Sequence, residues 1–159
     1  DTICDLLIEE DLDVAFVART GNADNIRTIL KHPAQMVGSD GLLTGERPNP
    51  RSYGTFPRKI SLFAQQEKVL SVGAAIRSAT GLPAKILGMK DRGTIAPGFV
   101  ADLVVLDPGT LADKATFDEP HQYCEGISYV LIGGDFSVYR GKATGALHGR
   151  AIEMPPKNN

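Results

Sequence analysis

The chain has 159 residues, 42% of them hydrophobic and 23% charged, with a formal net charge of −2 and a pI of about 5.9. This length and composition fit one ordinary globular domain, or one moderate domain with a small appendage. Because there is no block of Lys and Arg and no apolar run near the roughly 18 residues that cross a bilayer, neither a nucleic-acid partner nor a membrane is expected.

The first 40 residues alternate helical and strand patterns. Apolar residues at helical spacing predict a first helix over residues 3–12, and a second helix follows at residues 22–32, capped by Asn22 or Asp24. Short apolar runs predict strands at residues 14–19 and 35–39. The order strand, helix, strand is typical of a parallel sheet.

Residues 40–58 contain three glycines and three prolines and are predicted to form a long loop without a regular element. The next stretch is helical in character, with one helix around residues 60–64. Ser71 is expected to cap another helix, which runs to Thr80 and ends at Gly81. A further short turn follows Pro83.

From about residue 90 the pattern becomes β-rich. The run Leu103–Leu106 predicts a strand, and a hairpin is expected between strands near residues 127–132 and 136–139. Its turn is Gly133-Gly134, since two glycines accept the positive φ of a tight primed turn. The chain is thus expected to divide into an α/β part at 1–89, a β part at 90–152, and a frayed tail at 153–159.

Asp40 is the first candidate for a reactive group. It follows the predicted strand at 35–39 and precedes Gly41 and the long loop. A carboxylate at the C-terminal end of a barrel strand could activate a water and later protonate a leaving amine. Asp-Gly is also a common turn pair, so the local sequence alone favours a scaffold role over a functional one.

Other polar residues carry weaker signals. Arg51 and Arg58 could hold a substrate carboxylate or pair with a surface acid. Tyr53 could line a pocket or fix the loop to the body of the protein. No two of the histidines, His32, His121 and His148, have the spacing of metal ligands, so a metal site built from them alone is not expected. His121 is interpreted as a loop residue held by hydrogen bonds.

The cellular compartment can be inferred from the two cysteines and from the N-terminal residues. Cys4 and Cys124 fit neither a CxxC pair nor a disulfide framework, so reduced thiols are predicted. The chain starts inside a helical pattern, without a Met or a signal-like apolar stretch. We therefore expect a cytoplasmic protein and a chain cut from a longer one.

The order of several segments resembles that of one known family. These segments are "VGSDG", "PRSYGTFPR", "ATGLPAKILGMKDRGTIAPGFVADLVVLDP", "ATFDEPHQYCEGISYVLIGG" and "TGALHGR". Together they closely resemble the C-terminal part of the N-acyl-D-amino-acid deacylases (D-aminoacylases) of the amidohydrolase superfamily. The resemblance covers residues 5–152.

The resemblance implies a fold class and a site. The chain would be an α/β protein, the C-terminal fragment of a metal-dependent (β/α)₈ barrel with its last two strands, followed by part of a small β-sandwich. Such enzymes hydrolyse an amide with a zinc-bound water. Asp40 would be the acid/base at the end of the last strand, and in some members this residue touches a metal. Arg51 would anchor the substrate carboxylate, with Ser39 and Tyr53 beside it.

The chain departs from the family pattern in two ways. Asn49, Cys124 and Gly133 replace the usual His, Pro and Asn, and Asn49 lies in the expected active-site loop. The family's metal histidines are absent, because the chain has room for two of eight barrel strands, which need about 250 residues. Zinc catalysis needs about three protein ligands. The chain alone is therefore expected to bind no zinc and to be inactive.

Three hypotheses remain. The first is a part of a zinc-dependent deacylase of N-acyl-D-amino acids that needs its missing N-terminal half. The second is a non-catalytic module that self-associates into a homo-oligomer, because the unpaired edges of a partial barrel would be apolar. The third is a dihydropyrimidinase-like cyclic amidase. A carboxylate clamp in the "PRSYGTFPR" loop argues against this third hypothesis, since it suits acyclic acylamino acids better.

Overall fold

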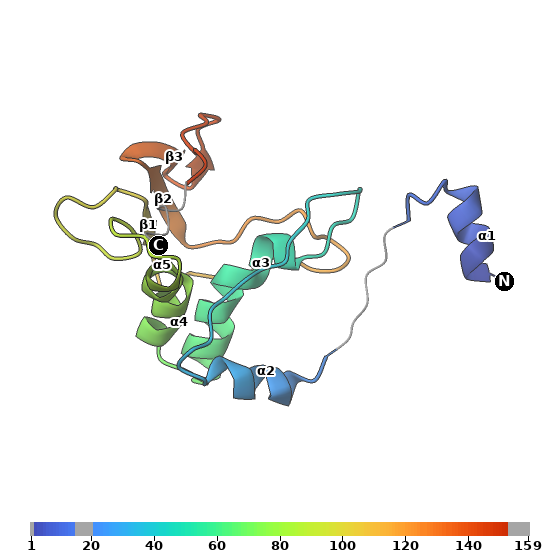
Figure 1. Ribbon diagram of the computed structural model, residues 1–159, viewed down its shortest axis with the longest axis horizontal. Helices are drawn as coiled ribbons and strands as arrows, with labels where there is room; N and C mark the ends of the chain where they lie inside the picture. Colours follow the sequence, from blue (N-terminus) through green and yellow to red (C-terminus); the bar gives the residue numbers. More distant parts are fainter. Residues whose placement is uncertain (1, 15–20, 153–159) are drawn as a thin grey trace, which may run out of the picture.

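The computed structural model describes residues 2–14 and 21–152 (Figure 1). Helices occupy the first part of the chain, strands the last. The elements, in chain order, are α1 (Thr2–Glu9), α2 (Ala23–Leu30), α3 (Arg51–Arg58), the π-helix η1 (Lys59–Gln66), α4 (Val72–Ala79), α5 (Gly81–Ile86), β1 (Leu103–Leu106), β2 (Ile127–Ile132), β3 (Asp135–Tyr139) and β4 (Lys142–Ala143). Helices α2 to α5 lie together, with the sheet beyond them, and α1 lies apart.

Two helices begin where polar caps were expected. The Asn22 side chain accepts hydrogen bonds from the backbone amides of Asp24 (2.8 Å) and Asn25 (3.3 Å) at the start of α2. The Ser71 hydroxyl accepts one from the Ala74 amide (3.1 Å) at the start of α4. Each bond satisfies an amide that has no partner within its helix. Both predicted caps are confirmed.

A bidentate ion pair holds α2 against the end of η1. The Arg27 guanidinium donates to both carboxylate oxygens of Glu67, through Nε (2.8 Å) and Nη2 (2.9 Å). The hydrogen bond from Arg27 lowers the pKa of the Glu67 carboxyl below its usual value. Helix α2 is therefore tied to the other helices by a side-chain contact between residues 40 positions apart.

The sheet is antiparallel throughout, in the order β1-β2-β3-β4. The expected strands at residues 103–106, 127–132 and 136–139 are confirmed, as is the turn between the last two. Gly133 and Gly134 have φ values of 63° and 97°, which other residues adopt with difficulty. The Asp102 carboxylate accepts a hydrogen bond from the Gly133 amide (2.8 Å), so the turn is fixed to the start of β1.

The packed interior is small. Among the described residues the buried hydrophobic side chains are Ala64, Ala75, Leu82, Ala84 and Leu111. The chain has an accessible surface of 11887 Å², whereas a compact protein of 17.0 kDa exposes about 7,700 Å². Much apolar surface is therefore open; in α1, for example, Ile3 and Ile8 are 74% and 75% exposed.

The strand predicted at residues 35–39 is not formed, and this segment is extended but irregular. Within the described part of the chain, one backbone hydrogen bond joins it to another element, from the Val37 amide to the Ser78 carbonyl in α4 (3.1 Å). Met36, predicted to be buried, is 41% exposed. A parallel strand needs neighbouring strands to complete its ladder. The neighbour expected at residues 14–19 lies, apart from Val14, outside the described residues.

The prediction of a loop over residues 40–58 was wrong in its second half, where α3 forms. Pro50 stands at the N-cap of α3, where a proline disturbs no helical bond. Pro57 lies inside the helix, which continues directly as the π-helix η1. Similarly, α4 ends at Ala79 as expected, but Gly81 begins α5 at once.

The described helices are short, and none of them has the length and apolar character needed to cross a bilayer. The expected tail at 153–159 lies outside the described residues.

Candidate functional site

Asp40 and Arg51 come together in the structure. The guanidinium Nη2 of Arg51 lies 2.9 Å from Oδ2 of Asp40. Asp40 ends the extended segment that starts at Gln35, and Arg51 is the first residue of α3. Their side chains are 86% and 45% exposed, respectively. An ion pair this open to water has a net stability of about 0 to 1 kcal/mol, so another ligand could displace either partner.

The local backbone explains why the two residues meet. The start of α3 is set by Asn49, whose side-chain oxygen accepts a hydrogen bond from the Arg51 amide (3.0 Å). The Ser52 hydroxyl donates to the Leu42 carbonyl (3.1 Å), which holds α3 against the segment after Asp40. A Cβ at Gly41 would lie 2.7 Å from the Ser52 Cα. Only a glycine at position 41 leaves room for this close approach.

The hydrogen bonds of the other two predicted site residues, Ser39 and Tyr53, go to partners other than Asp40 and Arg51. The half-buried Ser39 accepts a hydrogen bond from the Gly41 amide (3.2 Å) and so shapes the turn around Asp40. Tyr53 contacts His121 instead: its hydroxyl lies 3.1 Å from His121 Nδ1. Its ring also packs edge-on against Tyr123, with centroids 5.6 Å apart.

His121 fixes the loop that precedes α3. Its Nε2 lies 2.9 Å from the Glu46 carbonyl oxygen, which can only accept, so Nε2 donates and Nδ1 accepts from Tyr53. The interpretation of His121 as a loop residue held by hydrogen bonds is confirmed. Sequence reasoning did not connect it with Tyr53, because the two residues are 68 positions apart.

Arg58 is engaged elsewhere. Its Nη1 lies 3.3 Å from Oδ2 of Asp113, whose side chain is 10% exposed. Of the two roles left open by the sequence, pairing with an acid is therefore the one observed. Arg51 remains as the arginine beside Asp40.

The cysteines offer no activated nucleophile. Both are free thiols, with Cys4 exposed and Cys124 half-buried. Burial raises the pKa of the Cys124 thiol above its usual value, which lowers the fraction present as reactive thiolate.

The described residues do not fit a zinc site by themselves. They contain no group of three or more His, Cys, Asp or Glu side chains that could hold a metal ion. Asp40, the carboxylate at the candidate site, has the cationic Arg51 as its partner instead. Because a zinc site needs about three protein ligands, further ligands would have to come from outside these residues.

Known proteins resemble this chain over most of its length. The sequence profile of the amidohydrolase family matches residues 2–138. The N-acyl-D-glutamate deacylase of Alcaligenes xylosoxydans xylosoxydans is 40% identical over 111 residues, which are 70% of this chain and 23% of that protein.

Two crystal structures are similar in shape as well. A D-aminoacylase, described as defining a novel subset of amidohydrolases, is 38% identical with a TM-score of 0.76, over 79% of this chain and 26% of its own. The N-acyl-D-glutamate deacylase of Bordetella bronchiseptica, in complex with zinc and a phosphonate mimic of the tetrahedral intermediate, is 40% identical with a TM-score of 0.71, over 73% of this chain and 24% of its own.

The chain thus spans about a quarter of the length of these relatives. The profile match, by contrast, covers nearly all of its described residues. The chain therefore belongs to the amidohydrolase family.

Proposed function

We propose that the chain is part of an enzyme that deacylates N-acyl-D-amino acids, in which Asp40 is the acid/base and Arg51 binds the substrate carboxylate. Residues 1–89 would belong to the barrel of that enzyme and residues 90–152 to its β-sandwich. The observation that carries the proposal is the ion pair between Asp40 and Arg51, an acid and a carboxylate-binding group side by side at the start of α3.

The proposed roles follow from the chemistry of the two groups. Asp40 would take a proton from the attacking water as its oxygen bonds to the acyl carbon. It would pass that proton to the amine nitrogen as the C–N bond breaks, which leaves a carboxylic acid and a free D-amino acid. The planar guanidinium of Arg51 suits the α-carboxylate of the substrate, because it can donate two parallel hydrogen bonds.

In the structure one oxygen of the Asp40 carboxylate already contacts the Arg51 guanidinium, at 2.9 Å, as the carboxylate of a substrate would. A bound substrate would take over the guanidinium and release Asp40 toward the scissile amide. Ser39 would keep the turn in shape, and Tyr53 would position the loop through His121 rather than touch substrate.

The exposure of Asp40 predicts that this chain alone is inactive. Enzyme sites work in cavities that exclude bulk water, and an 86% exposed carboxylate has no such walls. In this proposal the walls, and the ligands of the zinc found in the relative's structure, come from outside the described residues.

The test is a chimera in which the 159 residues replace the matching quarter of D-aminoacylase. Zinc-dependent hydrolysis of N-acetyl-D-amino acids is expected. Asp40→Asn should lower kcat about 10²- to 10⁴-fold, the usual contribution of a general acid/base. Arg51→Gln should raise KM about 10- to 100-fold, because hydrogen bonds to a charged group are lost.

Two controls match these variants. Asp118→Asn and Arg150→Gln change the same residue types at exposed positions outside the site. If Asp40→Asn were as active as Asp118→Asn, Asp40 would not be the acid/base. Hydrolysis by the unfused chain would show that it does not need the remaining enzyme.

Self-association is a second candidate function, favoured by the open apolar surface. In α1 the exposed fractions of Ile3 and Ile8 are far above those of a helix packed into a domain. Sedimentation velocity is expected to show a homo-oligomer. A compact, well-folded monomer would contradict this second candidate and leave the first untouched.

A further inference from the structure

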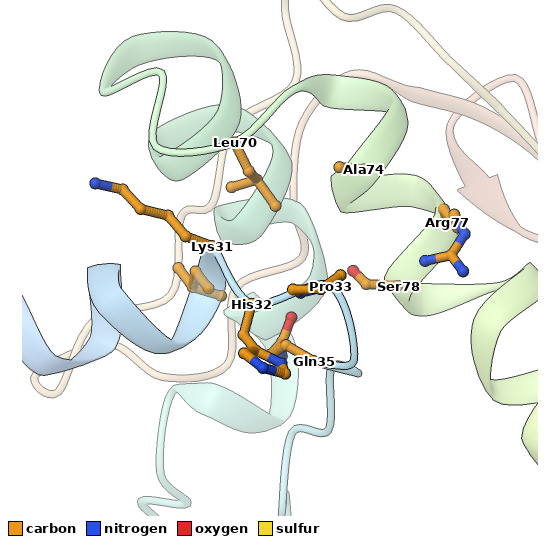
Figure 2. Close-up of a pocket in the computed structure, with 9 residues that line it drawn as sticks. Lys31, His32, Pro33, Gln35, Leu70, Ala74, Arg77 and Ser78 are labelled. Atoms are coloured by element: carbon orange, nitrogen blue, oxygen red, sulfur yellow. The ribbon is translucent and has the colours of Figure 1, made fainter.

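A small pocket lies away from Asp40 and Arg51. It has a volume of about 80 Å³ and sits between the end of α2, the turn that follows it, and α4 (Figure 2). Gln35 and Ser78 point toward each other at its inner end, while Lys31 and Arg77 extend to opposite sides. The wall is completed by Leu30, His32, Pro33, Leu70 and Ala74.

A buried lysine stands behind this pocket. Lys59, at the start of η1, is 4% exposed. Its ammonium donates hydrogen bonds to the Gln35 side-chain oxygen and to the Ser78 hydroxyl, the latter at 2.6 Å. Both acceptors belong to the pocket wall, so the charge lies directly behind its inner surface. A lysine ammonium has three donors, and these bonds use two of them.

No negative charge balances Lys59 in the described part of the chain. Neither of its partners is ionised, and its ammonium forms no ion pair with a described carboxylate. Burial lowers the pKa of Lys59, which is the expected response of a cation removed from water without a counter-ion. A buried charge of this kind is costly unless a partner neutralises it.

The pocket supplies further positive charge and no acid. Lys31 and Arg77 are exposed residues of its wall, and none of the described residues that line it is Asp or Glu. The long side chains of Lys31 and Arg77 can turn inward over a bound anion. The cavity has room for a few waters or for one small ionic group.

We propose that this pocket binds a small tetrahedral oxyanion, either inorganic phosphate or the phosphate group of a small metabolite, with Lys59 as its buried cation. Four oxygens in a tetrahedron suit donors that approach from several directions, and Arg77 and Lys31 stand on two sides of the pocket. Lys59 would attract the anion from behind the wall, through its charge and through the Gln35 and Ser78 side chains that it holds. A planar carboxylate would engage fewer of these donors.

The site is separate from the one proposed for catalysis. Gln35 and Asp40 stand at opposite ends of the same extended segment, which spans at most about 17 Å at 3.3 Å per residue, and neither Asp40 nor Arg51 lines the pocket. The anion site does not depend on the deacylase function, and the failure of either proposal leaves the other standing.

Binding can be measured on the full chain by titration calorimetry with inorganic phosphate at pH 7 and constant ionic strength. Saturable binding to one site is expected. Lys59→Met should weaken it at least tenfold, and Arg77→Gln about three- to fivefold. Lys90→Met, at an exposed position away from the pocket, is the matched control and should bind as the unmodified chain does.

Glycerol 3-phosphate distinguishes the two sources of the anion. Binding tighter than that of free phosphate indicates a phosphorylated metabolite, and equal or weaker binding indicates phosphate itself. If Lys59→Met fails to fold, two other measurements still test phosphate binding in the pocket. One is the affinity of the Arg77→Gln variant, and the other is broadening of the ³¹P resonance of phosphate by the unmodified chain. Equal affinity in Lys59→Met and Lys90→Met, or no broadening, would overturn the proposal.

Discussion

Two regions of the molecule differ in where their backbone hydrogen-bond partners come from. One is the sheet between Leu103 and Ala143, and the other is the segment between Gln35 and Arg58. Each strand of the sheet pairs with its neighbour in the sequence, so the hydrogen-bond ladder closes within 41 residues. The segment from Gln35 to Asp40 has the apolar pattern of a strand, but among the described residues only one backbone hydrogen bond joins it to another element, α4. Antiparallel structure can complete itself locally, whereas a parallel strand depends on distant partners.

The two regions also differ in their contribution: the sheet contributes stability, and the segment contributes the candidate site residues. The self-sufficient sheet holds none of the candidate site residues, and the incompletely supported segment ends in Asp40 and faces Arg51. Reactive groups at strand ends depend on the completeness of the sheet that presents them. Changes in the sheet should therefore affect stability, while changes at Asp40 should leave it nearly unaltered.

The largest effect is expected from Gly126→Ala, next to β2. Gly126 has a φ of 84°, and an added Cβ would lie 2.5 Å from backbone atoms of Leu111. The strain and the clash should lower the free energy of unfolding by about 2 to 4 kcal/mol, as measured by urea unfolding. Gly38→Ala in the other region, with nothing within 4 Å, should change it by less than about 0.5 kcal/mol. Similar losses of unfolding free energy in both variants would contradict the difference between the two regions.

A smaller effect is expected from pH in the helical region, where Lys59 is buried. Its pKa is lowered in the folded state, so between that pKa and the ordinary 10.5 the unfolded chain binds more protons. Stability should therefore rise with pH over this window, by at most about 1.4 kcal/mol per pH unit.

Lys59→Met removes the titrating group and should flatten this rise. Urea unfolding at pH 7 and pH 9.5, followed by far-ultraviolet circular dichroism, measures it in both proteins. A rise of the same size in Lys59→Met would assign the pH dependence to other groups.

The smallest effect is expected from Asp40→Asn. The ion pair with Arg51 is exposed to water, so its loss should change the free energy of unfolding by less than about 0.5 kcal/mol. Asp40→Ala should cost about 1 kcal/mol more, because alanine tolerates a φ of 48° poorly. If Asp40→Asn destabilised the chain as much as Gly126→Ala, the separation of stability from chemistry would be wrong.

The elements that could be predicted are those with local causes. Ser71 caps α4 through an amide three residues away, and Gly133-Gly134 closes a hairpin between adjacent strands. The strand at residues 35–39 could not be predicted correctly, because its formation depends on partners distant in the sequence. Helix α3 was missed because its prolines were counted as breakers, although Pro50 stands where a helix accepts one.

For the candidate site, too, only the features with local causes could be predicted from the sequence. Asp40 and Arg51 could be singled out by their residue types and by the family resemblance, but their ion pair depends on the close approach of Gly41 to Ser52. Lys59 gave no signal at all, since a lysine in a helical pattern usually faces water. Its burial results from packing against Gln35 and Ser78, 24 and 19 residues away.

The backbone at Asp40 restricts the site in one more respect. A φ of 48° lies in the left-handed region, where glycine, asparagine and aspartate are the residues most readily found. The shape of the turn thus restricts which residue types can occupy position 40, whatever chemistry they could perform there. Of these three, aspartate alone can bind and release a proton. A protein engineer who wanted glutamate here would have to redesign the turn first.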